Sequence, residues 1–149
     1  MFERFGKDSR AVVVQARHIA VESGSPTVEA EHLLLALTET RNSPGLDRDT
    51  VRDALDAEQR RSLAVVGISE ADFDLPSPAP LAAEPQWGTS AKSALQRAAQ
   101  VAARRKQRRI EPRHLLLAVL ESRAGTIPRA LEIAGLDRLE LARQVDASF

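Results

Sequence analysis

The sequence predicts an all-α protein, a pseudo-twofold tandem repeat of two four-helix units with eight helices in all. Glu31–Leu37 reads EHLLLAL, and the pattern returns 82 positions later as RHLLLAV at Arg113–Val119. The ungapped match extends over residues 9–41 and 91–123, which indicates a duplication whose two products face each other. No segment shows sustained alternation with β-branched residues, so we expect no sheet. Aromatic residues are few, and the leucine and alanine that dominate the apolar residues suit packed helices.

The first repeat, about residues 1–73, carries apolar residues at helical spacing. Three of its expected helices begin near Ser9, Ala30 and Asp47, and Ser69 caps a short fourth one. The apolar positions of the third helix run to Val66, and Gly67 can close it in a left-handed conformation.

Four prolines among small residues mark an extended linker at about 74–88, and the second repeat follows at about 89–149 within the same single domain. Its expected helices begin near Ser90, at Pro112, after a Thr126 cap and after an Asp137 cap. Aligning Gly67 with Gly135 gives an offset of 68, so the first repeat has 14 additional residues (82 minus 68), which we place in the charged stretch 41–61.

Composition excludes several classes of function. There is no cysteine, which excludes thiol nucleophiles, thiolate metal sites and disulfides. The chain has 21 lysine and arginine residues and 21 aspartate and glutamate residues, so its formal net charge is zero and no overall field attracts nucleic acid or an anionic membrane. No run approaches the roughly 18 apolar residues that span a bilayer, and we expect a soluble cytoplasmic protein without a membrane partner.

The sequence offers no convincing catalytic or metal site, so we expect no enzyme and no cofactor. Ser69 follows a glycine as in a nucleophile elbow, but the second glycine and the preceding strand are missing. Gly6–Ser9 lacks the glycine and hydroxyl spacing of a phosphate-binding loop. His32 and His114 occupy equivalent helix starts, where an imidazole can hold the preceding loop, and no further ligand at metal-site spacing accompanies them.

Two charged features have more than one interpretation. Five basic residues crowd the segment before Pro112: Arg104, Arg105, Lys106, Arg108 and Arg109. They suit a solvated loop or an acidic partner, and less well nucleic acid, because no stacking aromatic is near. Glu31 is either a first-turn anion that stabilises its helix or a fixed charge that receives a guanidinium.

Several stretches resemble the N-terminal repeat domain of Clp unfoldases, and the ClpC type in particular: Met1–Phe5, Val12–Ala16, Glu31–Leu37 and Arg113–Leu117. The resemblance covers essentially the whole chain. It implies a non-catalytic domain that docks substrates and adaptors for an ATP-driven unfoldase and its peptidase. The ATPase rings that normally follow this domain are missing, so the chain is either an excised domain or a free-standing homologue. The long insertion in the first repeat and the proline linker favour the free-standing homologue.

The resemblance also implies ligand sites. In the family, the glutamate before each histidine receives phosphoarginine; Glu31 matches it, whereas Arg113 reverses the charge in the second repeat. Gly6 stands where relatives often carry a threonine, which weakens the Glu31 site. Positions similar to the cyclic-peptide antibiotic site of ClpC domains are Phe2, Arg10, Val13, Val14 and Lys92.

Trp87, at the end of the proline linker, is interpreted independently of the family. It is either a plug over the interface between the repeats or an exposed anchor for a ligand. The expected partners are Clp unfoldase and protease components, adaptor or substrate proteins, and cyclic peptides. The protein would then act as a decoy that captures ligands or, alternatively, as an adaptor that delivers substrates. A small helical nucleic-acid-binding protein is the less favoured alternative.

Overall fold

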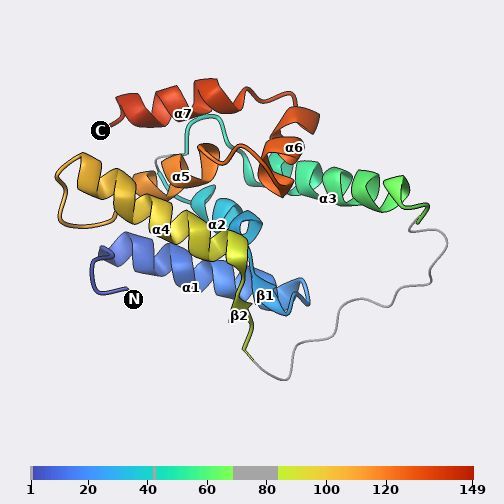
Figure 1. Cartoon of the computed structure of the whole chain (residues 1–149), viewed down its shortest axis with the longest axis horizontal. Coiled ribbons are helices and arrows are strands. Elements are labelled where there is room, and N and C mark those ends of the chain that lie inside the picture. The colour runs from blue at the N-terminus through green and yellow to red at the C-terminus, as the bar shows by residue number, and fades with distance from the viewer. Residues whose placement is uncertain (1, 42, 69–83) are drawn as a thin grey trace.

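The computed structural model describes residues 2–41, 43–68 and 84–149, which form seven helices and two short strands (Figure 1). The elements are α1 (Lys7–Glu22), β1 (Thr27–Val28), α2 (Ala30–Leu37), α3 (Arg48–Val65), β2 (Gln86–Trp87), α4 (Thr89–Arg104), α5 (Pro112–Leu120), α6 (Thr126–Ile133) and α7 (Arg138–Ala147). The all-α prediction is confirmed. The eighth expected helix, capped by Ser69, lies outside the described residues.

The two repeats have the same internal packing. α1 packs on α2 as α4 packs on α5, and α3 of the first repeat lies against α6 of the second (Figure 1). The leucine runs of α2 and α5 supply the centre of one shared core, where Leu33, Leu34, Leu115 and Leu116 are at most 1% exposed. Their burial explains why these two segments are the most similar parts of the repeats. None of the described helices combines the length and apolarity that crossing a bilayer requires.

The chain crosses between the repeats twice in the same way. β2 pairs in parallel with β1, and Trp87 lies opposite Val28. Phe5 and Ile110 form a matching parallel bridge. Under the 82-residue offset, Phe5 is equivalent to Trp87 and Ile110 is equivalent to Val28. In both places the glycine after the aromatic residue donates its N–H to the carbonyl opposite, at 2.9 and 3.0 Å.

The prediction of no sheet is therefore wrong in detail. The strands are two residues long and pair segments far apart in the chain, so they leave no local alternation to detect. The end of the predicted linker, residues 86–88, belongs to this crossing, and residues 74–83 lie outside the described part of the chain.

Helix ends follow the residue types at most positions. The Asp47 side chain accepts from the N–H of the residue three positions on, and the Asp137 side chain caps α7 in the same manner. Gly67 has the expected positive φ of 78°. Thr126 is not a cap, because Gly125 holds that position at a φ of 105° and Thr126 is the first residue of α6.

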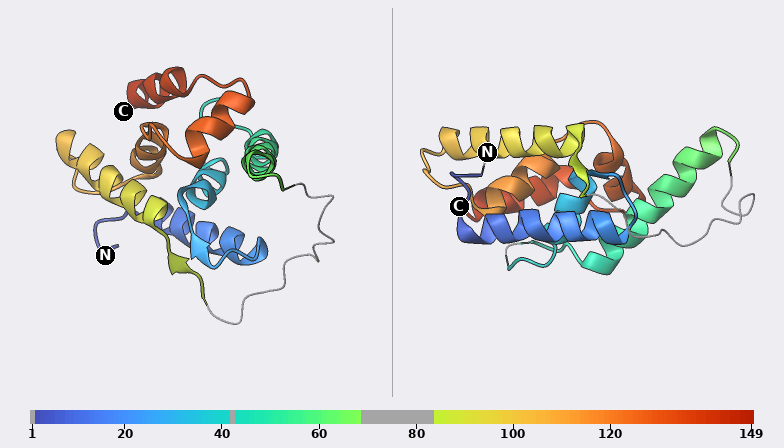
Figure 2. Two further views of the ribbon diagram at one scale, coloured as in Figure 1. Left: turned by 45° about the vertical axis from the view of Figure 1, so that its right-hand side comes forward. Right: turned by 90° about the horizontal axis from the view of Figure 1, so that it is seen from below.

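α3 is the main departure from the symmetry of the repeats. It has 18 residues where α6 has 8, which puts most of the predicted insertion into this helix. Figure 2 shows its end projecting from the body of the molecule. Only its beginning packs on the core, so Val66, expected on the apolar stripe, is 68% exposed, and Val65 is 86% exposed.

One buried ion pair joins α3 to α6. Glu58 is 5% exposed, and its carboxylate accepts from Arg129 Nε at 2.9 Å and from the Ser62 hydroxyl at 2.7 Å. The pair links the two repeats across their third helices. It also brings a carboxylate of α3 into the neighbourhood of Glu31.

Candidate functional site

An apolar groove lies along α1 and the segment before it. It has a volume of about 430 Å³ and is lined by Phe2, Glu3, Arg10, Val13, Val14 and Arg17. The side chains of residues 10, 13, 14 and 17 meet on one face because they follow the helical period. Val13 is 6% exposed and packs into the core, whereas Val14 is 54% exposed. The groove thus presents apolar side chains to solvent with a guanidinium near each end.

Trp87 adjoins this groove through aromatic contacts. The Phe2 ring lies between two others, with its centroid 5.7 Å from the Trp87 ring and 5.2 Å from the Phe5 ring. The Arg17 guanidinium stands 5.7 Å from the centre of the Trp87 ring. Trp87 is half-buried in β2, so it is part of the crossing between the repeats and still reaches the groove.

Of the residues predicted for a cyclic-peptide site, the structure brings together Phe2, Arg10, Val13 and Val14, with Trp87 beside Phe2. Lys92 is exposed on α4 and does not line the groove.

A second groove contains Glu31. It has a volume of about 430 Å³ and is formed by the first turn of α2, one face of α4 and the segment from the end of α5 to α6. Glu31 is half-buried, and burial raises its pKa, an effect that nearby Glu29 and Glu58 increase and a hydrogen bond to backbone opposes. Arg97 also lines this groove and donates to the Ala118 carbonyl at 3.1 Å. The groove therefore holds two carboxylates, those of Glu31 and Glu29, and one fixed guanidinium.

A third groove is the pseudo-symmetric counterpart of the second, and it contains Arg113. It has a volume of about 1100 Å³. Positions related by the 82-residue offset line both grooves: Asp8 and Ser90, Ala11 and Ser93, Val12 and Ala94, Gln15 and Arg97, Ala36 and Ala118, Thr40 and Ser122, Glu111 and Glu29, Pro112 and Ala30, Arg113 and Glu31. The duplication thus produced two grooves with the same frame and different charges.

The Glu31 groove and the Arg113 groove are each built across the two repeats. The Ser90 hydroxyl of α4 donates to the Glu29 carboxylate before α2, and the Ala30 N–H donates to that hydroxyl at 2.8 Å. A Cβ on Gly88 would lie 1.8 Å from Glu29 Oε1, and one on Gly6 would lie 2.8 Å from Glu111 Oε1. Gly6 therefore belongs beside Glu111 and the Arg113 groove. Its association with Glu31, expected from the sequence, is wrong, because each helix start meets the opposite repeat.

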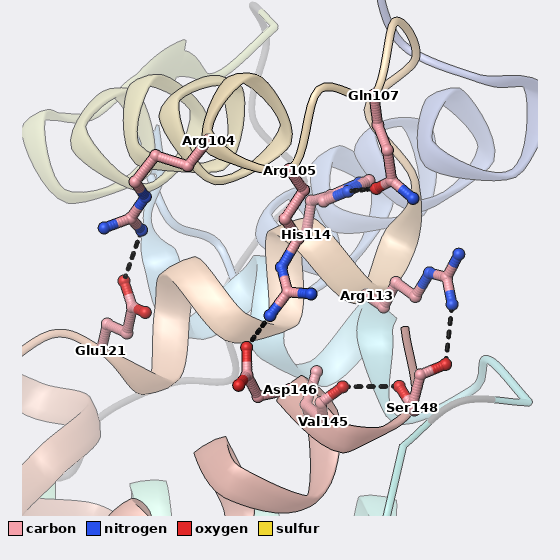
Figure 3. Close-up of polar contacts among 9 residues, drawn as sticks. All are labelled: Arg104, Arg105, Gln107, Arg113, His114, Glu121, Val145, Asp146 and Ser148. Carbon is pink, nitrogen blue, oxygen red and sulfur yellow. Dashed lines mark hydrogen bonds and ion pairs between the residues drawn. The ribbon is translucent and has the colours of Figure 1, made fainter.

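The arginine-rich segment is not one patch. Arg104 pairs with Glu121 and Arg105 pairs with Asp146 (Figure 3), and neither arginine lines the Arg113 groove. Arg108 and Arg109 line that groove. Arg113 donates to the Ser148 carbonyl at 2.8 Å, as Figure 3 shows.

His32 and His114, which occupy equivalent positions in the two repeats, each hold the loop before their helix, as predicted. His32 Nδ1 accepts from the Glu29 N–H and His114 Nδ1 accepts from the Glu111 N–H, both at 2.8 Å. Burial lowers the pKa of both, and for His114 burial together with the Arg113 and Arg105 charges lowers it to about 4. The neutral imidazole is the form that holds each loop. Within the described ranges no group of three potential ligands is placed to hold a metal ion.

Comparison with known proteins agrees with this geometry. Residues 87–149, which are Trp87 of β2 and the second repeat, match the family described as the Clp repeat (R) N-terminal domain. The N-terminal domain of the caseinolytic protease-associated chaperone ClpD from Arabidopsis thaliana superposes with a TM-score of 0.74 at 19% identity, covering 99% of this chain and 96% of that one. The chain has the fold of a Clp N-terminal domain.

Two further structures share the fold. The Hsp104 N-terminal domain from Candida albicans gives a TM-score of 0.66 at 19% identity, with 96% of this chain and 89% of that one covered. A structure from a malarial protein secretion system gives 0.69 at 13% identity, with 97% and 94% covered. A search of curated proteins finds no significant match. These superpositions establish a common Clp N-terminal fold. At such low identities they do not identify the ligand, which has to be argued from the grooves.

Sequence reasoning missed several residues that form the grooves. Glu29 and Glu111 are identical in the two repeats and precede both histidines, so the repeat alignment contained their signal. Arg17 is at helical spacing from Val13 and Val14, which would have placed it on the same face. Arg41 gave no signal, because only the fold brings the end of α2 to the segment before α5.

Proposed function

We propose that this protein is a non-catalytic binding domain of a Clp protease system and that its apolar groove captures peptide ligands, including cyclic peptides, adaptors or substrate segments. The observation that carries the proposal is the exposure of Val14, 54%, beside Phe2 and Val13 in a defined groove. An apolar side chain left in solvent beside an aromatic cluster is typical of a surface that a ligand covers.

The groove suits a compact apolar peptide. Its volume of about 430 Å³ accommodates a few side chains, not an extended chain. Arg10 and Arg17 supply N–H donors at its edge that can bind peptide carbonyls. A cyclic ligand also loses little conformational entropy on binding, which favours a shallow groove.

The same groove supports two biological roles. As a decoy, the protein would withdraw ligands from a Clp unfoldase by mass action. As an adaptor, it would deliver a bound substrate. Adding the protein to a reconstituted unfoldase and peptidase distinguishes them, because a decoy lowers degradation or relieves inhibition by a cyclic peptide, whereas an adaptor increases the turnover of a substrate.

Trp87 is the only tryptophan and adjoins the groove, so its fluorescence reports occupancy. We expect a saturable change on titration with a cyclic peptide of aromatic and branched aliphatic residues. Val14→Glu should weaken binding at least about tenfold, because it places a charge in an apolar contact. Val65→Glu is the matched control, since Val65 is 86% exposed at the far end of α3. Equal affinity of both variants for the peptide would show that the apolar groove is not the binding site.

We further propose that the Glu31 groove receives a guanidinium group, as a phosphoarginine-type site. Glu31 supplies the carboxylate, and Arg97 stands in the same groove where it can meet a phosphate. Because the Glu31 pKa is raised, affinity should decrease as the pH falls. Free phosphoarginine should bind the native protein and not Glu31→Gln. Unchanged binding by this variant would contradict the assignment.

A further inference from the structure

The Arg113 groove differs from the Glu31 groove in the sign of its charge. Four cationic side chains line it: Arg41, Arg108, Arg109 and Arg113. Three carboxylates also line it, those of Asp8, Glu39 and Glu111. The Glu39 carboxylate pairs with Arg48, and that of Glu111 lies against the Gly6 backbone. The remaining charge in the groove is positive, although the whole chain carries no net charge.

The cations are available to a ligand. Arg41, Arg108 and Arg109 are exposed, and across residues 2–41, 43–68 and 84–149 no salt bridge involves them. Arg113 is held in place: its guanidinium lies 4.5 Å from the Phe149 ring centre and donates to the Ser148 carbonyl. This ordering lowers the entropic cost of using Arg113 in a contact.

The basic surface continues beyond the groove. A neighbouring depression of about 500 Å³ shares Arg108 and Arg109 with it and adds Arg4, Lys7 and Arg10, with Glu3 as its acidic residue. Arg10 also lines the apolar groove. The positive surface therefore continues from the Arg113 groove to the start of α1.

We propose that the Arg113 groove binds an acidic polypeptide segment, whose spaced carboxylates pair with Arg108, Arg109 and Arg113. Guanidinium groups bind carboxylates in bidentate fashion, which gives both charge and direction to such a contact. The carboxylates of Asp8 and Glu39 interrupt the positive surface, so it matches a ligand with separated charges. A nucleic acid carries a charge on every residue and would also find no aromatic platform among the lining residues.

The test uses fluorescence anisotropy with a labelled peptide in which glutamates alternate with glycine and serine, at about 0.1 M salt. We expect saturable binding to the native protein and at least about tenfold weaker binding to Arg108→Glu/Arg109→Glu, from two lost pairs and two new repulsions. Arg60→Glu/Arg61→Glu is the matched control: both residues are exposed on α3 and the change in net charge is identical. Its affinity should stay within about threefold of the native value.

Four results would overturn the proposal. They are no saturable binding by the native protein, an equal loss in the two double variants, equal binding of a lysine peptide of the same length, and tighter binding of a single-stranded oligonucleotide. Val14→Ser, which leaves the net charge unchanged, should bind the acidic peptide with native affinity, so failure of this proposal is distinguishable from failure of the apolar groove. Circular dichroism of each variant verifies that the helices remain.

Discussion

Ser9 supplies a buried hydrogen bond between the repeats, and its replacement tests the crossing of Phe5 and Gly6 with Ile110. The Ser9 side chain is inaccessible to solvent, and its hydroxyl donates to the Ile110 carbonyl at 2.6 Å. In Ser9→Ala that carbonyl still accepts from the Gly6 N–H at 3.0 Å, so no buried acceptor is left unpaired. The expected loss is therefore the net value of one hydrogen bond, about 1 kcal/mol.

The second repeat contains the reciprocal experiment. Ala91 stands at the position equivalent to Ser9 and is also inaccessible, and Val28 stands at the position equivalent to Ile110, with a carbonyl that accepts from the Gly88 N–H at 2.9 Å. If the two crossings are equivalent, a serine hydroxyl at position 91 finds the same acceptor. Ala91→Ser should then be neutral or stabilising by up to about 1 kcal/mol, whereas an unpaired buried hydroxyl would cost about 1–3 kcal/mol.

Urea unfolding monitored by circular dichroism measures both changes, with a loss of about 1 kcal/mol lowering the midpoint by roughly 0.5 M. Ser93→Ala, an exposed serine on α4, is the control and should shift the free energy of unfolding by less than about 0.5 kcal/mol. A loss above about 1 kcal/mol in Ala91→Ser, or none in Ser9→Ala, would refute the equivalence of the two crossings.

Three further perturbations test features of the fold. His114 has a folded pKa of about 4, below its unfolded value, so its contribution to stability is full above about pH 6.5 and is lost as the pH falls toward 4. In urea unfolding, the free energy of unfolding of the native protein should therefore fall by about 2 kcal/mol more than that of His114→Gln between pH 7 and 4.5. Lys106 has a φ of 56°, and the equivalent residue of the first repeat, Gly24, has a φ of 69°. In thermal unfolding, Lys106→Gly should stabilise the protein by about 0.5–1 kcal/mol and Gly24→Ala should destabilise it by about 1 kcal/mol. Arg129→Met leaves the Glu58 carboxylate buried without its ion pair and should lower the free energy of unfolding by about 1–2 kcal/mol, a loss that the 58% exposure of the arginine moderates. In a double-mutant cycle, Glu58→Leu combined with Arg129→Met should recover most of this loss.

The repeat and the helix periods made most of the fold predictable. Helical spacing and cap residues are local signals, so Asp47, Gly67, Pro112 and Asp137 placed helix ends correctly. The strands β1 and β2 could not be predicted, because their pairing depends on a contact between residues about 60 positions apart. The exposed end of α3 escaped prediction for a related reason: apolar spacing marks a helix face, not whether another element covers it.

The candidate site was predictable only in part. Phe2, Arg10, Val13 and Val14 are close in sequence, and the structure places them in one groove. Lys92 is far from them in sequence, and the structure leaves it exposed on α4 and outside the lining of this groove. The reversed charge at Arg113 was visible in the repeat alignment, but its combination with Arg41 arises only when the repeats interlock.

The central claim is that this Clp N-terminal fold acts through its apolar groove on α1, beside Trp87. Nuclear magnetic resonance with labelled valine methyl groups and a labelled indole tests it directly, on addition of the apolar cyclic peptide. The account predicts that the signals of Val13, Val14 and Trp87 shift and saturate together while those of Val65 and Val66 stay unchanged. Shifts confined to Val65 and Val66 would contradict it and move the binding surface to the projecting end of α3.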